Sequence, residues 1–537
     1  MTPATGSEPA LERGVALLQA SRFQEALASF SQALRADPAG LAPRLGLARA
    51  CAGSGDLFAA AAWLSDAIRV APQHFEAHQL LADVLLSQKL HAQALPVYAH
   101  LLGALGLRTP ANLLHGGFCQ EMLAQLPQAA ALYREAIAMR ADFMEAHVDL
   151  AGILWRMEDF EGSLRHAGEA VALSPDHPFA VRILGTALLN LNRLDEAEVQ
   201  LRRALDLQPA FVLAELDLAF CLLLAGRYPE GWPLYESRWR DTERVKRPVF
   251  FQPDHEWQGP QRQPQARQRL AVYAEQGLGD VLQFIRYLPQ LQAAGAQVAC
   301  SIQQELVPLI ESSFPGVEMP APGRNLVVQQ HVALLELPGR LGTTLDNIPA
   351  QVPYLAAPEP ARQRWRERLA PWSDQRKVGL AWSGSTVQVN NRNRALPLGL
   401  LAPLVAQARL AGVAMFSLQK GDAGDWTDLD VASTGLVDLT GEWQDFGDSA
   451  AMVEQLDLVI TVDTAIAHLA GALGKPVWVL LPPNADWRWL LERDDSPWYP
   501  TARLFRRDFG EARSKQVARM VRAFEEWLRD WWLRDPA

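Results

Sequence analysis

A small residue, usually followed four positions later by a bulky one, recurs along the first 240 residues of the chain. Successive copies begin 34 or 35 positions apart, at Ala26, Ala60, Ala94, Ala129, Ser163, Ala197 and Gly231. Apolar residues within each copy fall at helical spacing, and four copies close on Pro38, Pro72, Pro175 and Pro209. Small residues let two helices approach closely, and proline stops the second helix. The period therefore predicts a stack of helix pairs.

This period resembles that of the tetratricopeptide repeat family, in about seven units over residues 10–240. One helix pair cannot bury its apolar stripe alone, so we expect the units to stack into an α-solenoid with a concave face. Such a face typically binds a protein partner; a spacer or a dimerisation arm is the alternative. The last unit carries Trp232, Tyr235 and Trp239, which suits a cap packed against the next domain.

Strand-like and helix-like stretches alternate after the repeats. Residues 241–268 are rich in Pro, Gln and Arg, which is typical of an exposed linker. Apolar strand-like runs follow at 270–274, 296–303, 378–382, 414–418, 458–462 and 477–481. We expect two α/β lobes, over residues 269–357 and 372–535, each built on a parallel sheet that helices cover on both faces. Two such lobes in tandem indicate a cleft between them.

Overall composition restricts the classes of partner. The formal net charge of −11 argues against a nucleic acid as the main partner, because phosphate binding needs local basicity. The four cysteines show no paired spacing, which is typical of a reduced, intracellular protein. The sequence shows neither a secretory signal nor a run of eighteen apolar residues; we therefore expect no membrane span and a cytoplasmic location.

Two polar turns follow predicted strands. Gly277-Leu278-Gly279-Asp280 comes after the first strand, and Asp463-Thr464-Ala465 follows the strand at 458–462. Ligands of open α/β sheets bind beyond the carboxyl ends of the strands, where the N–H groups of a helix start attract phosphate. The second turn is thus suited to bind a diphosphate, and Asp463 could bind the hydroxyls of an attached sugar. The alternative for Asp463-Thr464 is an ordinary helix N-cap, which contributes ~1 kcal/mol.

Residues 270–535 resemble the glycosyltransferase family 9 proteins, which are heptosyltransferase-like enzymes. The resemblance rests on "EQGLGDVLQFIRYLPQL", "VGLAWSGS", "NNRNRALPL", "FSLQKGD", "DLVITVDTAIAHLAGALGKPVWVLLP" and "DWRWLLERDDSPWYPTARLFR". It implies a GT-B fold, in which two Rossmann-type α/β lobes bind the acceptor (first lobe) and a nucleotide sugar (second lobe). The fold class expected for the whole chain is therefore α + α/β.

The resemblance also implies roles for individual residues. Asp280, in the turn with Gly277 and Gly279, stands where these enzymes keep the acidic group proposed as general base. Asp463, Thr464, Ala465 and His468 match the motif that binds the donor sugar and its diphosphate, although Ala465 replaces the usual glycine. The remaining candidates are basic and could neutralise the charge on the leaving nucleoside diphosphate. Arg392 and Arg394 lie in the loop where heptosyltransferases carry a lysine, and Lys420 is a weaker candidate for this role.

These features predict an inverting glycosyltransferase that moves a sugar from a nucleotide sugar to a hydroxyl of a glycan or protein. GT-B enzymes generally need no divalent metal, so we expect neither a metal nor a cofactor, with the nucleotide sugar as co-substrate. The repeats would bind the acceptor or another protein. The alternative is a scaffold in which the transferase half is degenerate. The sugar, the nucleotide and the acceptor stay open.

Overall fold

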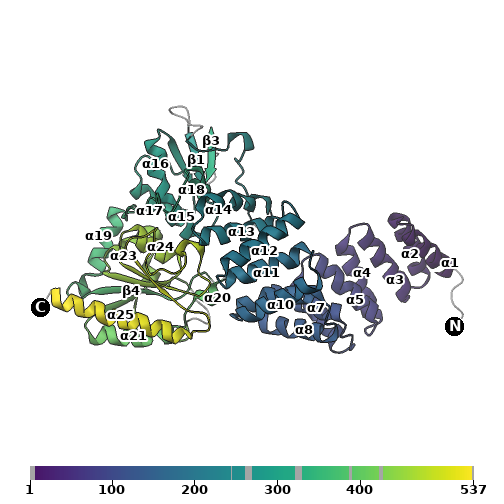
Figure 1. Cartoon of the computed structure of the whole chain (residues 1–537). Coiled ribbons are helices and arrows are strands. Elements are labelled where there is room, and N and C mark those ends of the chain that lie inside the picture. Colours follow the sequence, from purple (N-terminus) through teal and green to yellow (C-terminus); the bar gives the residue numbers. More distant parts are fainter. Residues whose placement is uncertain are drawn as a thin grey trace. The chain divides into compact units, whose positions relative to one another are not determined.

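The structure is a computed structural model, and it describes residues 7–242, 245–260, 269–320, 329–385, 390–421 and 427–534 (Figure 1). The chain forms two compact units, Met1–Ile183 and Leu184–Ala537. None of the helices in the described ranges combines the length and the apolar character that crossing a bilayer requires.

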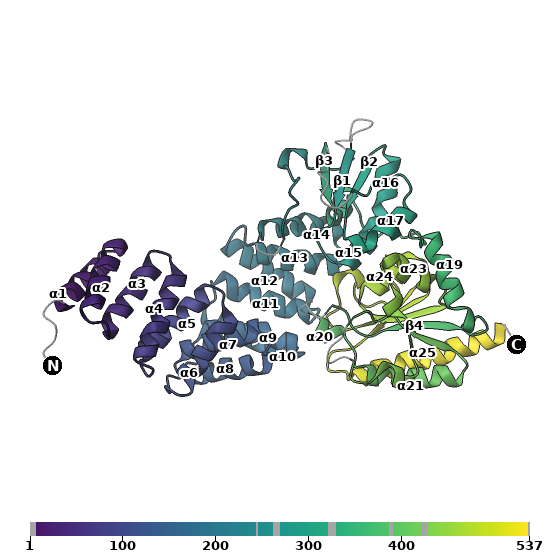
Figure 2. The ribbon, with the colours of Figure 1, turned by 180° about the vertical axis from the view of Figure 1, so that it is seen from behind.

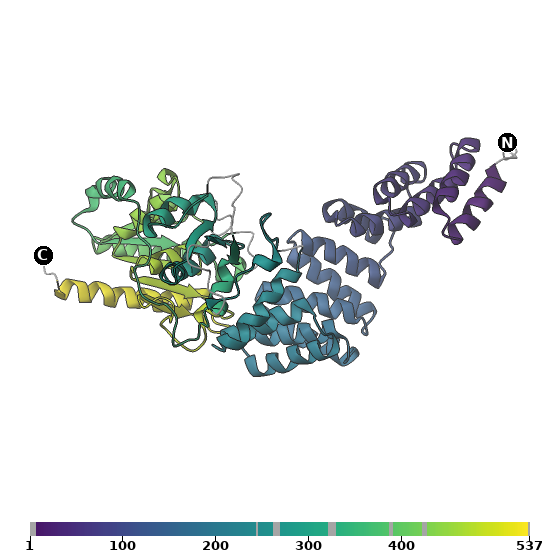
Figure 3. The ribbon, with the colours of Figure 1, turned by 90° about the horizontal axis from the view of Figure 1, so that it is seen from above.

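The first unit consists of helices that stack side by side (Figure 3). They are α1 (Ser7–Gln19), α2 (Phe23–Ala36), α3 (Leu41–Gly53), α4 (Leu57–Val70), α5 (Phe75–Ser87), α6 (His91–Leu102), α7 (Pro110–Met122), α8 (Leu126–Met139), α9 (Met144–Leu154) and α10 (Phe160–Leu173). The repeated small residues, such as Ala26 and Ala60, lie in the second helix of each pair and are fully buried. The bulky residues that follow them, such as Phe30 and Tyr98, are buried as well. The 34-residue period thus marks the contacts that hold each pair together.

Helix α11 (Pro178–Asn190) spans the boundary between the units, and the second unit continues with α12 (Leu194–Leu207), α13 (Val212–Leu224), α14 (Tyr228–Tyr235) and the 3₁₀ turn η2 (Glu236–Arg240). These last repeats share one hydrophobic core with the α/β region, in which Tyr228 and Trp232 pack among Phe284, Trp487 and Trp498. The indole N–H of Trp498 donates to the Tyr228 hydroxyl over 3.2 Å. The aromatic residues of the last repeat therefore join it to the next domain.

The α/β region contains two parallel sheets (Figure 2). The first has the order β2-β1-β3, with β1 (Arg269–Tyr273), β2 (Gln297–Ser301) and β3 (Gln330–Ala333). The second has the order β6-β5-β4-β7-β8-β9, with β4 (Lys377–Ala381), β5 (Ala414–Ser417), β6 (Val437–Asp438), β7 (Leu458–Val462), β8 (Val477–Leu481) and β9 (Ala502–Arg506). Numbered within the sheet, this is the order 3-2-1-4-5-6 of doubly wound nucleotide-binding folds. The chain changes direction of winding between β4 and β7.

Helices cover both faces of the second sheet. Leu458 and Ile460 of β7 pack with α21 (Leu398–Leu410) and α25 (Arg513–Arg534), whereas Val459 packs with α23 (Phe446–Glu454) and α24 (Ala465–Ala472). The remaining helices are α15 (Leu278–Phe284), α16 (Leu288–Ala293), α17 (Val307–Ser313), α18 (Leu337–Arg340), α19 (Glu359–Arg368), α20 (Asn391–Arg394) and α22 (Val431–Thr434). Because both faces are buried, the strands are nearly continuous apolar runs.

Part of the predicted linker belongs to the first lobe. Residues 245–260 lie against the first sheet, where Trp257 is buried and its backbone N–H donates to the carbonyl of His331 over 2.8 Å. The rest of the predicted exposed stretch, residues 261–268, lies outside the described residues. The imidazole of His331 contacts the backbone of Gln252, so this histidine joins the segment to the sheet.

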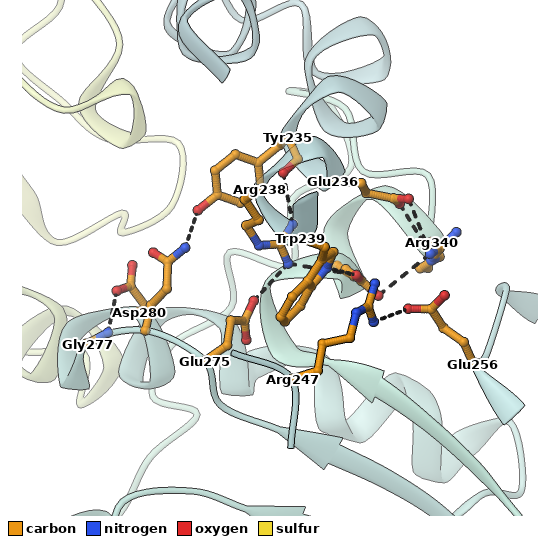
Figure 4. Close-up of polar contacts among 12 residues, drawn as sticks. Tyr235, Glu236, Arg238, Trp239, Arg247, Glu256, Glu275, Gly277, Asp280 and Arg340 are labelled. Atoms are coloured by element: carbon orange, nitrogen blue, oxygen red, sulfur yellow. Dashed lines mark hydrogen bonds and ion pairs between the residues drawn. The ribbon is translucent and has the colours of Figure 1, made fainter. Parts of the chain in front are cut away.

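A buried polar network connects the last repeat to the segment after β1 (Figure 4). The Arg238 guanidinium donates to Glu275 Oε1 over 2.8 Å, and both side chains are almost fully buried. The neighbouring Trp239 indole donates to Glu336, and the Gln276 amide donates to the Tyr235 hydroxyl over 2.6 Å. Residues 275 and 276 directly precede Gly277, so the last repeat holds the backbone that enters the first polar turn.

We expect Arg238→Met to destabilise the second unit by about 3–5 kcal/mol, because it leaves the buried Glu275 carboxyl without its partner. The matched control is Arg240→Ala, which removes a partly exposed ion pair with Glu215 and should cost less than about 1 kcal/mol. Thermal unfolding of the full chain measures both. Equal, small losses would show that the buried pair does not stabilise the junction.

Candidate active site

The winding of the sheets brings the two predicted turns together. Gly277–Asp280 follows β1, and Asp463-Thr464 follows β7, which is one of the two strands at the change of winding. The other strand, β4, leads into Ser383–Ser385. Parallel strands all end at the same edge of a sheet, and ligands of such folds bind at this point.

A cavity of about 660 Å³ lies between the turns. Of the ten residues that the sequence singles out, nine line it: Gly277, Gly279, Asp280, Arg394, Lys420, Asp463, Thr464, Ala465 and His468. They come from both α/β lobes and are spread over almost two hundred positions of sequence. Nine of the ten predicted residues therefore share one cavity.

Arg392 is the exception, because it lies outside this cavity. Its side chain is exposed and is absent from the cavity lining, and its carbonyl accepts from the Arg513 guanidinium over 2.8 Å. Arg392 and Arg394 stand two positions apart on α20, so their side chains leave this helical turn on different sides. The predicted pair of arginines reduces to Arg394 within the cavity.

The two lobes meet where α15 and α24 begin. A Cβ on Gly279 would lie 2.9 Å from Cδ2 of His468 and 3.5 Å from the Cα of Ala465. A carbon–carbon distance of 2.9 Å is shorter than ordinary packing allows. The absence of a side chain at Gly279 thus lets the two turns approach each other.

Thr464 does cap a helix, as the alternative interpretation has it. Its hydroxyl accepts from the backbone N–H of Ile466 over 3.2 Å and lies 3.1 Å from the hydroxyl of Thr461. Asp463 does not take part in the cap. Burial raises the pKa of Asp463, while the charge of Arg394 opposes this shift. Asp463 lines the cavity.

His468 contributes a neutral imidazole. It is buried, stacks on Trp489 with 5.6 Å between ring centroids, and its Nδ1 lies 2.9 Å from the Tyr499 hydroxyl. Burial, together with the charges of nearby arginines including Arg488, lowers the pKa of His468 well below its usual value. Near neutral pH this side chain adds no positive charge for a phosphate.

Asp280 makes two contacts. One oxygen accepts from the backbone N–H of Gly277 over 3.0 Å, and the other accepts from the Arg488 guanidinium over 2.5 Å. Burial raises the pKa of Asp280, and Arg488 partly offsets the shift. Sequence reasoning missed Arg488, although it lies in the quoted stretch "DWRWLLERDD". Only its contact with a carboxylate 208 positions earlier identifies it.

Gly384, in the segment after β4, lies next to the Arg394 guanidinium. The backbone N–H of Gly384 donates to the side-chain oxygen of Asn391 over 3.0 Å, and a Cβ on Gly384 would lie only 2.4 Å from Arg394 Nη2. Glycine at 384 therefore leaves room for the guanidinium. Lys420 lies at the end of β5, where its ammonium donates to the Trp443 carbonyl over 2.8 Å.

Carboxylates outnumber cations around the cavity. The lining includes the acids Asp280, Glu305, Asp445, Asp463 and Asp486 and the bases Arg394, Lys420 and Arg488. Within the described ranges, no three of the His, Cys, Asp and Glu side chains form a group that could hold a metal ion. Among the described lining residues, Arg394, Lys420 and Arg488 are the positively charged groups that an anionic ligand could contact.

Comparison with known proteins identifies the helical part. Two tetratricopeptide repeat models match residues 17–84 and, in overlapping copies, 123–178, 148–209 and 183–239. The chain carries tetratricopeptide repeats. The matched residues all lie among the helices α1–α14 and η2, so these matches concern the repeats and not the cavity.

Curated proteins and solved structures with matching segments were also found. Protein FlbA of Caulobacter vibrioides is 28% identical over 386 residues, which cover 66% of this chain and 63% of FlbA. This share of 537 residues exceeds the length of the repeats and linker, so the alignment reaches into the α/β region. Two solved structures give TM-scores of 0.31: MamA from Desulfovibrio magneticus RS-1 (20% identity, 32% of this chain and 98% of that one) and YrrB, which is described as a tetratricopeptide repeat protein (18% identity, 34% and 95%).

We expect Gly279→Ala to destabilise the second unit by about 1–3 kcal/mol, because the new methyl group overlaps the His468 ring. Gly441→Ala is the matched control, since a Cβ there meets nothing within 4 Å. Thermal unfolding of the two variants measures the difference. Equal stability would mean that the turns do not need their close contact.

Proposed function

We propose that the second unit is a metal-independent glycosyltransferase of GT-B type, which transfers a sugar from a nucleotide sugar to a hydroxyl. We propose also that the repeats bind the protein that carries or presents this acceptor, as tetratricopeptide repeats typically bind proteins. One observation carries the proposal: the single cavity contains an acidic side chain of the first lobe, Asp280, opposite the helix start and basic groups of the second lobe.

In the proposed reaction the diphosphate of the donor lies at the start of α24, near Arg394 and Lys420. Helix N–H groups and arginine stabilise the charge that develops on a departing diphosphate. The acceptor oxygen attacks the anomeric carbon, and the bond from this carbon to the diphosphate oxygen breaks with its electron pair. Asp280 takes the proton of the acceptor hydroxyl, while Asp463 binds hydroxyls of the sugar.

A second function, a protein-binding scaffold without transfer, has its own support. The proposed base, Asp280, is already paired with Arg488, which makes it a poorer proton acceptor. The family-model matches fall on the repeats. These matches favour protein binding more directly than they favour transfer. The two functions differ in one property, since only the transferase must bind a nucleotide sugar in the cavity.

The arginines on α20 provide a matched test. We expect Arg394→Gln to weaken nucleotide-sugar binding roughly 10- to 100-fold, because a charge-assisted contact contributes about 1.5–3 kcal/mol. Arg392→Gln, on the same helix but outside the cavity, should change affinity less than about twofold. Calorimetry of the full chain with a panel of ADP-, UDP- and GDP-sugars measures both. Equal losses would place the donor elsewhere, and no binding to any donor would favour the scaffold.

Replacement of the proposed base separates binding from chemistry. Asp280→Asn should bind the donor at least as tightly as wild type and lower the rate of sugar transfer or donor hydrolysis by about 10²–10⁴-fold. The rates of wild type and variant are compared on whichever donor binds. Equal rates on every donor would exclude Asp280 as the base.

Affinity should also depend on pH. The diphosphate of a nucleotide sugar keeps its charge near neutrality, whereas burial raises the pKa values of Asp280 and Asp463. Their raised pKa values mean that acidification makes them neutral earlier than ordinary carboxyl groups, which titrate near pH 4. Lowering the pH from about 8 to about 5.5 should therefore strengthen donor binding several-fold. Asp463→Asn should flatten this dependence; an unchanged slope would contradict it.

A further inference from the structure

Arg488 is held at the junction of the two lobes by contacts on several sides. Arg488 belongs to the 3₁₀ turn η11 (Trp487–Trp489), and only 8% of its surface is exposed. Its Nη1 donates to Asp486 over 2.9 Å, and its Nη2 donates to Asp280 over 2.5 Å. Its guanidinium carbon lies 4.5 Å from the ring centroid of Trp487 and 5.4 Å from that of Phe284. The arginine lines the cavity and lies against two aromatic rings.

The guanidinium is only partly satisfied. Among the described residues its Nε is buried and has no hydrogen-bond partner, and a buried donor without a partner is unfavourable. Nε and Nη2 lie on one edge of a guanidinium, where two parallel N–H bonds can bind two oxygens of a single anion. Asp280 uses the Nη2 half of this edge, while its other oxygen accepts from Gly277.

A phosphate group would satisfy this edge better than Asp280 does. It presents two oxygens at the spacing of the fork, and arginine prefers such bidentate contacts. Asp486 would keep Arg488 in place through Nη1. The exchange requires no new positive charge in the cavity, because Arg488 already lines it.

We propose that Arg488 binds the donor diphosphate through its Nε–Nη2 edge and in doing so releases Asp280. This inference rests on the proposed transferase function. Without the diphosphate, Arg488 pairs with Asp280, which counts against Asp280 as a base. When the diphosphate binds, the Asp280 carboxylate is free to accept the acceptor proton, so binding of one substrate prepares the site for the other. Arg488 also replaces Arg392 as the second arginine of the donor site.

The test uses inorganic pyrophosphate and, separately, a nucleotide sugar, with calorimetry of the full chain. Arg488→Lys keeps the charge but cannot make two parallel N–H contacts, so we expect at least tenfold weaker binding of both ligands. The matched control is Arg493→Lys, because Arg493 pairs with Asp495 outside the cavity lining. Equal affinities of wild type and Arg488→Lys would overturn the inference.

A double-mutant cycle identifies the exchange itself. Asp280→Asn should strengthen pyrophosphate binding, because the competing carboxylate is lost along with its repulsion. In an Arg488→Gln background Asp280 no longer competes for the arginine and only repels the pyrophosphate. Asp280→Asn should therefore increase pyrophosphate affinity by a smaller factor in this background. Equal gains in the two backgrounds would overturn the exchange. Circular dichroism checks that the Arg488→Gln variants fold; where they do not, the Arg488→Lys background replaces them.

The two proposals fail in different ways. Nucleotide-sugar binding that does not depend on Arg488 refutes the inference and leaves the transferase proposal standing. A wild-type chain that binds neither pyrophosphate nor any nucleotide sugar refutes both.

Discussion

The close approach of two helix starts is the constraint on which the candidate site depends. Gly279 leaves just enough room for the start of α15 to rest on His468 and Ala465 at the start of α24. This contact places a carboxylate of one sheet and the helix N–H groups of the other around the same cavity. A side chain at residue 279 would push the lobes apart, since packed interiors tolerate little added volume.

The last repeats are part of the framework of this site. Tyr228 and Trp232 share a core with both α/β lobes, and Arg238 pairs with Glu275 just before the first polar turn. The structure accordingly divides after Ile183, within the repeats, and the predicted boundary at residue 240 falls inside the second unit. A partner bound to the last repeats would contact elements that position Asp280. This arrangement links the last repeats physically to the lining of the cavity.

Local patterns in the sequence predict the elements well. The 34-residue period marks the buried faces of the helix pairs, and the apolar run at 458–462 coincides with β7. Features that depend on long-range contacts are harder to predict. Arg392 looks equivalent to Arg394 in the sequence, but the single helical turn of α20 sends their side chains to different sides. Arg488 has no local signal, because its partner Asp280 is 208 residues away. The polar composition of 245–260 hides Trp257 and the contacts that hold this segment on the first sheet.

The central claim is that a nucleotide sugar binds between the two turns. Hydrogen exchange of the full chain, measured by mass spectrometry with and without a saturating nucleotide sugar, tests it most directly. The account predicts slower exchange in both 277–284 and 463–472 when the donor is bound. Binding that leaves both segments unchanged, or protects only the repeats, would contradict it.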